Sequence, residues 1–304
     1  WAAAFPLTRP IARRRARELF DLVAGFTYSQ VLFACVRLDL FEQLAGRSMT
    51  VAELATRMDM SPAAATRLLD AGVALRLFSR RLAPGHKPTY SLGVLGAPMV
   101  GNVALAAMVE HHAVLYADLA DPVGLLRAPA GKSALARYWP YAAAAHERPL
   151  NQVDVDPYSA LMAASMPLVA DEVLDAYSLA RHKRLLDVGG GEGAFAAAAA
   201  QRWPHLKLAV FDLPAVAQRA RRQVAARGLA DRIDVHEGSF LTDALPEGAD
   251  VISLVRVVHD HDDDHVLVLL NAVRKALPPH GVLLLAEPMA DTPGAQAMGD
   301  AYFG

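Results

Sequence analysis

Short aliphatic segments alternate with helical segments in the part of the chain that follows Arg181. Five such segments are found, at 185–188, 208–211, 233–236, 251–255 and 282–286. Strands of a parallel sheet are covered on both faces by helices, so they form continuous apolar runs. We therefore predict an α/β domain with a Rossmann-like parallel sheet over residues 181–304.

The N-terminal part of the chain has short helical segments followed by two extended segments that a turn connects. Thr50 precedes one helical segment and Glu53 follows three residues later, which is the pattern of a capping box. Ser61 and Pro62 mark the start of a second helix, and residues 84–85 mark the turn of a wing. These signals predict a winged-helix-like unit within residues 1–102.

A winged-helix unit suggests DNA binding, but its charges do not favour that function. The second helix, residues 61–75, has Arg67 as its one basic residue. A helix that reads the major groove needs donors for phosphates and base edges. We therefore expect the unit to mediate packing or dimerisation, which predicts a homodimer and no nucleic-acid partner.

Residues 103–180 are predicted to be mostly helical and to link the two domains. Several side chains in this segment have spacings that bring them together as one wall of a substrate pocket: Met108, His112, Tyr116, Met162 and Met166. An ordinary helical core explains the same spacing and remains the alternative. His111 and His112 are neighbours whose side chains diverge by about 100° on a helix, so we expect no metal there.

Composition and charge narrow the class of protein. The chain has 304 residues, is 54% hydrophobic and carries a net charge of −2, so it is long enough for two domains and has no overall field that attracts nucleic acid. Its one cysteine, Cys35, lies in an apolar segment and is expected to be buried. We expect a protein of the reducing cytoplasm.

The two ends of the chain and its most apolar stretch bear on membrane contact. Residues 94–109 are interrupted by glycine, proline and asparagine, so we predict no membrane span. The chain begins with Trp1 and ends at Gly304 without a terminating pattern, and we expect both natural ends and the last strands of the sheet to be missing. Five arginines near the start of the chain form a basic cluster: Arg9, Arg13, Arg14, Arg15 and Arg17. We expect this cluster to be a solvated helix face, and peripheral contact with an anionic membrane is the alternative.

A glycine-rich loop follows the first strand of the predicted sheet. It begins at Asp187 and includes Gly189 and Gly191 before a helical segment starts. Glycines allow a ligand to approach the backbone, and a helix start offers free amides. The same spacing fits a dinucleotide site, with Asp212 as the ribose-binding acid. The loop alone therefore leaves NAD and S-adenosylmethionine open.

Polar side chains follow the other strands, where an open α/β sheet binds its ligands. Asp212 and Leu213 end the second strand, and Ser239 with Phe240 could border an adenine after the third. His259 follows the fourth strand and would provide an acid–base group. Glu287 follows the fifth and could orient the imidazole.

The acidic block from Asp260 to Asp264 has two interpretations. It could cap the helix predicted over 266–277, since carboxylates favour a helix N-terminus. It could also supply metal ligands together with His259, His261 and His265, but consecutive acids without a fixed spacing argue against a metal. We also expect Asp260 to face the substrate pocket.

These motifs, in this order, resemble the plant-type small-molecule O-methyltransferases and their bacterial relatives. The resemblance spans nearly the whole chain and implies S-adenosylmethionine as the methyl donor. It implies that Asp187, Gly189 and Gly191 shape the donor loop, that Asp212 binds the ribose, that Phe240 flanks the adenine, that Arg256 lies near the donor and that His259 is the general base. The chain departs from the family in Ser239, which replaces an aspartate, and in His261, which replaces a tryptophan.

A closer resemblance is to the carotenoid O-methyltransferases of phototrophic bacteria, the demethylspheroidene type. It rests on the acidic block and on residues 111–122, 138–141, 287–289 and 299–303. It implies a hydroxylated carotenoid as the acceptor, and it leaves open whether the cytoplasmic protein associates with membranes to reach it. The alternatives are a phenolic or polyketide acceptor, an NAD-dependent oxidoreductase, or a non-catalytic winged-helix regulator.

Overall fold

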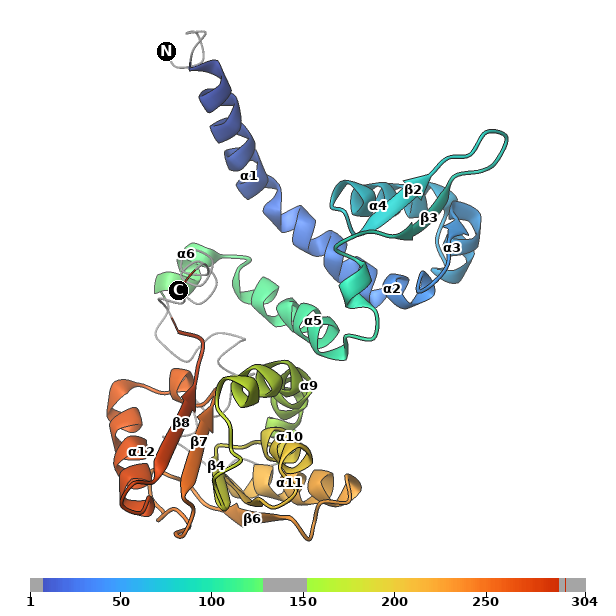
Figure 1. Cartoon of the computed structure of the whole chain (residues 1–304). Coiled ribbons are helices and arrows are strands. Elements are labelled where there is room, and N and C mark those ends of the chain that lie inside the picture. Colours follow the sequence, from blue (N-terminus) through green and yellow to red (C-terminus); the bar gives the residue numbers. More distant parts are fainter. Residues whose placement is uncertain (1–7, 128–151, 290–292, 294–304) are drawn as a thin grey trace. The chain divides into compact units, whose positions relative to one another are not determined.

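The computed structural model describes residues 8–127, 152–289 and 293, and the chain divides into two compact units, Trp1–Ala113 and Val114–Gly304. We call these the N-terminal and C-terminal units (Figure 1). The division falls within helix α5 (Val103–Asp118), whereas the sequence predicted a boundary at the start of this helix. The motifs expected at 138–141 and 299–303 lie outside the described residues.

The N-terminal unit is a small helical domain with a three-stranded antiparallel sheet in the order β1-β3-β2. Before α5, its elements are α1 (Arg9–Arg37), α2 (Leu40–Gln43), β1 (Met49–Thr50), α3 (Val51–Arg57), α4 (Pro62–Ala74), β2 (Phe78–Arg81), β3 (Thr89–Leu92) and the 3₁₀ helix η1 (Ala97–Met99). Strands β2 and β3 pair as the two extended segments of the predicted wing. The winged-helix pattern is therefore present.

Local capping explains where the helices of this unit begin. The Thr50 side chain accepts from the Glu53 backbone, and the Glu53 carboxylate accepts from the Thr50 N–H at 2.7 Å, which confirms the predicted capping box. The Ser61 hydroxyl caps α4 by accepting from the Ala64 N–H at 3.2 Å, and Pro62 is the first residue of this helix. Cys35 is buried in the core, as predicted.

Helix α1 bears on the prediction that the chain has no membrane span. Of the helices in the described residues, it is the one long and apolar enough to cross a membrane, on length and composition alone. The prediction of no membrane span rested on residues 94–109 and took no account of this helix. Its predicted basic cluster is exposed, as expected of a solvated helix face. Beyond this cluster the helix also exposes large apolar side chains, namely Leu19, Phe20, Leu22, Val23 and Phe26.

The C-terminal unit contains a five-stranded parallel sheet in the order β6-β5-β4-β7-β8. All five predicted strands are present: β4 (Arg184–Val188), β5 (Lys207–Asp212), β6 (Ile233–Glu237), β7 (Val251–Val255) and β8 (Val282–Ala286). The helical elements after α5 are α6 (Pro122–Arg127), α9 (Gln152–Ala176), α10 (Ala194–Arg202), α11 (Pro214–Ala226), the 3₁₀ helix η2 (Val258–Asp260) and α12 (Asp263–Ala276).

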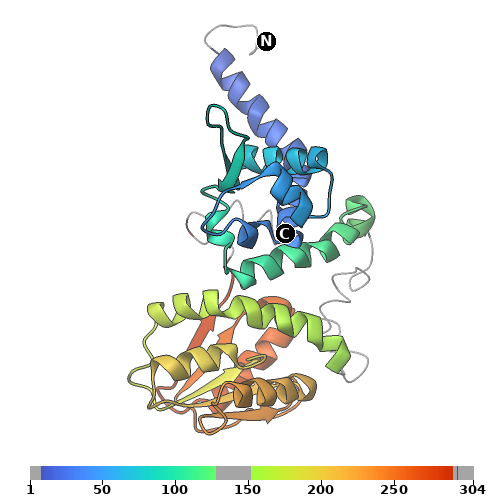
Figure 2. The same ribbon diagram turned by 90° about the vertical axis from the view of Figure 1, so that its right-hand side faces the viewer.

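Helices cover both faces of this sheet, as Figures 1 and 2 show. Neighbouring residues of β4 alternate between two cores: Leu185 packs with α9, α10 and α11, whereas Leu186 packs with α12. The chain leaves β4 toward β5 on one side and returns to β7 on the other side. Ligands of open α/β sheets bind at such a switch point, beyond the carboxyl ends of the strands.

Candidate functional site

The loop between β4 and α10 has a backbone that only glycine accommodates well. Gly189, Gly191 and Gly193 have φ values of 68°, 58° and 77°, in the left-handed region that L side chains avoid. A Cβ on Gly189 would also lie 2.8 Å from the Val257 side chain. The loop therefore lies close against the residues that follow β7.

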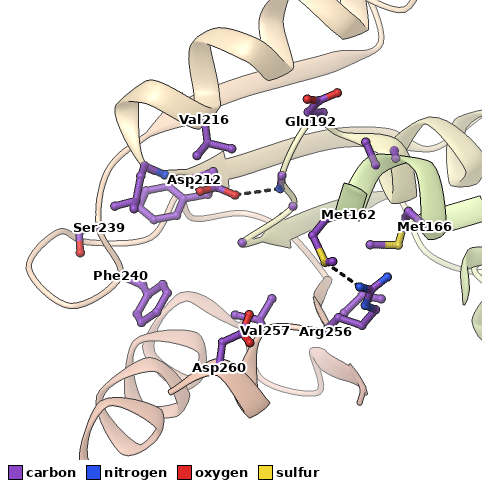
Figure 3. A pocket seen from close by; sticks show the side chains of 18 of the residues that line it. Met162, Met166, Glu192, Asp212, Val216, Ser239, Phe240, Arg256, Val257 and Asp260 are labelled. Atoms are coloured by element: carbon purple, nitrogen blue, oxygen red, sulfur yellow. Dashed lines mark hydrogen bonds between the residues drawn. The ribbon is translucent and has the colours of Figure 1, made fainter. Parts of the chain in front are cut away.

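Asp212 connects this loop to the end of β5. Its Oδ2 accepts a hydrogen bond from the Gly191 N–H at 2.8 Å, and its Oδ1 accepts from the Leu213 N–H at 2.7 Å (Figure 3). Burial raises the pKa of Asp212 to about 6, against the effect of these hydrogen bonds. A carboxylate has about four lone-pair sites, so Asp212 can also accept from the hydroxyls of a ribose.

Asp187 lies beneath the loop and does not line the cavity. It is 1% exposed, and its Oδ1 accepts from the Ser253 hydroxyl at 2.6 Å. Within the described residues its Oδ2 has no hydrogen-bond partner. Burial raises the pKa of Asp187 to about 7, and the nearby charge of Asp212 adds to the shift. Asp187 thus supports the loop from below, and its part in shaping the donor loop stays a prediction of the resemblance.

A cavity opens above the glycine loop at the carboxyl ends of the strands (Figure 3). Ten predicted site residues line it: Met162, Met166, Gly189, Gly191, Asp212, Leu213, Ser239, Phe240, Arg256 and Asp260. Four further residues line the cavity that were not predicted to do so from the sequence: Glu192, Val216, Val257 and His261. The combination of a glycine loop, an acid and an aromatic residue fits a nucleoside-containing ligand such as S-adenosylmethionine.

The two residues that depart from the family pattern lie at one end of this cavity. The Ser239 hydroxyl accepts from the Leu241 N–H at 3.3 Å, and the Ser239 N–H donates to Asp243 at 2.8 Å. The ring of His261 contacts Phe240 edge-on, with 5.1 Å between the ring centroids. Burial lowers the pKa of His261, which keeps it neutral near pH 7. This end of the cavity therefore offers an aromatic wall and neutral polar groups.

Arg256 connects the end of β7 to α9. It has a φ of 60°, which is unusual for a residue with a side chain. Its guanidinium donates to the Ser165 hydroxyl at 2.8 Å and contacts the Met162 sulfur at 2.6 Å (Figure 3). Met162 and Met166, both on α9, form an apolar wall of the cavity.

His259 and Glu287 form the contact that the sequence predicted. His259 Nδ1 and Glu287 Oε2 are 2.6 Å apart, and Glu287 Oε1 accepts from the Val257 and Val258 N–H groups at 2.8 and 2.7 Å. Neither side chain lines the cavity, but the adjacent Asp260 does, and its Oδ1 is 3.4 Å from His259 Nε2. The Glu287 carboxylate therefore holds the His259 imidazole in place beside the cavity.

Electrostatics at this pair favours a charged imidazole. The hydrogen bond to Glu287 raises the pKa of His259 above its ordinary value, and burial only partly opposes it. Burial alone would raise the pKa of Glu287, but its hydrogen bonds from His259, Val258 and Val257 bring it below the ordinary value. Glu287 thus remains a carboxylate that can stabilise a proton on His259.

The acidic block caps a helix, as one of its two interpretations predicted. Asp262 is the N-cap of α12 and accepts from the His265 N–H at 3.0 Å and from the His265 ring at 2.7 Å. Within the described part of the chain, no three potential ligand side chains gather as a metal site would require. Asp262 therefore has a structural role.

Three residues predicted for the substrate pocket lie on α5, the helix within which the chain divides into its two units: Met108, His112 and Tyr116. Helical spacing placed them on one face with one another, but it carried no information on which face packs toward the sheet. Their contact with a substrate remains a prediction.

Comparison with known proteins identifies the family. Residues 118–302 match the O-methyltransferase domain, and residues 20–100 match the O-methyltransferase dimerisation domain. The chain is 45% identical to the demethylspheroidene O-methyltransferase of Cereibacter sphaeroides, over 95% of this chain and 75% of the relative. It is 41% identical to the protein of the same name from Rhodobacter capsulatus, over 98% and 72%.

Solved structures agree with this assignment. Human N-acetylserotonin methyltransferase in complex with S-adenosylmethionine aligns with a TM-score of 0.71 at 28% identity, over 89% of this chain and 79% of that one. The mitomycin 7-O-methyltransferase MmcR aligns with a TM-score of 0.75 at 24% identity, over 97% and 86%, and shows the same fold. The NAD-dependent and regulatory alternatives are thereby set aside. The chain belongs to the O-methyltransferase family and is an S-adenosylmethionine-dependent enzyme.

Proposed function

We propose that the enzyme methylates a hydroxyl group of a hydroxylated carotenoid. Two relatives at 45% and 41% identity, both named demethylspheroidene O-methyltransferase, support this acceptor class. Met162 and Met166 form an apolar wall of the cavity that suits a polyene. The observation that carries the chemistry is the His259–Glu287 hydrogen bond beside this cavity.

The proposed mechanism needs alignment and one proton transfer. The bound donor supplies an activated methyl group, so the protein has to orient the acceptor oxygen, exclude water and remove a proton. Glu287 accepts a hydrogen bond from the Nδ1–H of His259, which leaves the Nε2 lone pair to take the hydroxyl proton. An aliphatic alcohol is a weak acid, so its proton leaves as the oxygen attacks. Glu287 stabilises the imidazolium that forms.

An acceptor comparison tests this proposal. The enzyme is incubated with isotopically labelled S-adenosylmethionine and a hydroxylated carotenoid, the same polyene without its hydroxyl, or a phenol, and products are identified by mass spectrometry. We expect one methyl group on the hydroxylated carotenoid, none on the second polyene, and turnover of the phenol at least about tenfold slower. Preferred methylation of the phenol would contradict the proposed acceptor and favour the phenolic alternative.

We also propose that the N-terminal unit mediates a homodimer. Residues 20–100 match the dimerisation domain, and α1 exposes large apolar side chains within this range, including Leu22 and Phe26. Exposed apolar patches of this kind mark interaction surfaces. Light scattering should give twice the mass of one chain, whereas a monomer at micromolar concentration would contradict the proposal.

We propose that the enzyme is cytoplasmic and that it reaches a lipophilic acceptor through a peripheral membrane contact. The N-terminal unit has 13 basic and 8 acidic residues, whereas the C-terminal unit has 17 and 24. The exposed arginines between Arg9 and Arg17 precede the segment that matches the dimerisation domain, so they need not be covered in a dimer. We expect flotation with anionic vesicles that salt abolishes; equal binding to zwitterionic vesicles would contradict this electrostatic contact.

A further inference from the structure

A buried ion pair joins the glycine loop to α11. Glu192 lies in the loop between Gly191 and Gly193 and lines the cavity (Figure 3). Arg219 Nε donates to Glu192 Oε1 at 2.8 Å, and a terminal nitrogen of the same guanidinium contacts the same oxygen. The side chain of Glu192 is only 5% exposed and that of Arg219 only 16%.

The pair connects the two halves of the donor site. One half is the glycine loop, and the other is the turn after β5, where Asp212 and Leu213 precede the first residue of α11. The bond from the Gly191 N–H to Asp212 links the same two segments one residue away from Glu192. The relative position of the loop and the turn is thus held by three contacts: the hydrogen bond from Gly191 to Asp212, the hydrogen bond from the Gly189 N–H to the Phe211 carbonyl at 2.8 Å, and the ion pair.

Burial makes this pair sensitive to the loss of either charge. A carboxylate that leaves water needs a partner, and removing the cation leaves an uncompensated buried charge. Asp187 and Asp212 add two further carboxyl groups beneath and beside the loop. Without Arg219, Glu192 would turn toward water and alter the backbone of the loop that it belongs to.

We propose that Glu192 and Arg219 are positioning residues for the methyl donor. Their ion pair holds the glycine loop in the conformation that receives S-adenosylmethionine. Neither residue takes part in methyl or proton transfer. The loss of the pair therefore weakens donor binding and raises the donor KM, while kcat at saturating donor changes little.

Arg219→Gln tests this role by calorimetric binding of S-adenosylhomocysteine. We expect the Kd to rise at least about tenfold, with kcat within about twofold of the wild type. Arg221→Gln is the matched control, because Arg221 lies on the same helix and pairs with Glu237 at 2.9 Å, but both side chains are about half exposed. The control should change the Kd by less than about twofold.

A double variant separates positioning from a general loss of packing. Glu192→Gln together with Arg219→Gln replaces the ion pair by two neutral amides and removes the uncompensated charge. We expect the double variant to bind S-adenosylhomocysteine more tightly than Arg219→Gln alone. Arg219→Lys keeps the charge but has a single nitrogen, and we expect its Kd to rise about three- to tenfold.

Three results would overturn the proposal. They are an unchanged Kd in Arg219→Gln or Arg219→Lys, a double variant that binds no better than the single one, and an equal loss in Arg221→Gln. Thermal unfolding of each variant establishes that it is folded, and Arg219→Lys decides the matter if Arg219→Gln is not. Because binding of S-adenosylhomocysteine is independent of the acceptor, failure here leaves the carotenoid proposal standing.

Discussion

Replacing Glu287 by glutamine should inactivate the enzyme by changing the tautomer of His259. Glu287 Oε1 accepts from two backbone N–H groups, while Oε2 faces His259 Nδ1 at 2.6 Å. In Glu287→Gln the amide oxygen stays with the two N–H groups, because an NH₂ group there would meet two donors. The NH₂ group then faces Nδ1, which has to become an acceptor, and the ring proton moves to Nε2.

The size of the effect follows from the loss of the base. An Nε2 that carries the ring proton cannot accept the proton of the acceptor hydroxyl. General-base catalysis is worth about 10²- to 10⁴-fold, so kcat should fall by about this factor, or about 3–5 kcal/mol in the barrier. The change does not touch the donor cavity, which neither His259 nor Glu287 lines. Binding of S-adenosylhomocysteine should therefore be unchanged.

The assay is single-turnover methylation with saturating donor, together with calorimetric binding. Asp262→Asn is the matched control, because Asp262 also accepts from a histidine Nδ1, at 2.7 Å, but lies outside the cavity. Its turnover should stay within about twofold of the wild type. A Glu287→Gln enzyme with turnover within about threefold of the wild type would refute the reasoning.

Further predictions concern pH, the glycine loop, stability and metals. Because the pKa of His259 is raised and its neutral form is the base, kcat/KM should fall as pH drops through a value above 6.5. Gly189→Ala should weaken binding of S-adenosylhomocysteine at least about tenfold, whereas Gly228→Ala, with the same φ of 68° but open space around it, should not. The pKa of Asp187 is about 7 in the folded protein against an ordinary 3.8, so between these pH values the native protein holds a proton that the unfolded chain releases. The Tm of the wild type should therefore fall as the pH rises from 5 to 8, and the Tm of Asp187→Asn should fall less. Arg232 donates to three backbone carbonyls at and after the end of α10, and urea unfolding of Arg232→Met should show a loss of about 1.5–3 kcal/mol. Exhaustive EDTA treatment should leave methyl transfer intact, and loss of activity restored by a divalent metal would contradict this.

Most of the sheet could be predicted because its strands are buried on both faces. Strand β7 is buried over all five residues and was predicted with its observed ends. The motif residues then followed from topology, since the carboxyl ends of parallel strands meet at one edge. This argument brought Asp212, His259 and Glu287 to the same edge without any knowledge of packing.

Contacts between distant side chains could not be predicted. The partner of Glu192 is on α11, 27 residues away, and its identity depends on how that helix packs. The guanidinium of Arg256 reaches back 91 residues to Ser165 on α9. Helical spacing similarly grouped Met108 with Met162 but could not determine whether both face the same cavity. Such pairings depend on tertiary packing, which periodicity does not encode.

Transfer of a labelled methyl group from S-adenosylmethionine to a hydroxylated carotenoid, compared between the wild type and His259→Ala, tests the central claim most directly. The account predicts that the wild type forms the methyl ether in a single turnover. It predicts that His259→Ala binds S-adenosylhomocysteine normally but transfers the methyl group at least about a hundredfold more slowly. Transfer at the wild-type rate by His259→Ala, with donor binding intact, would contradict the account.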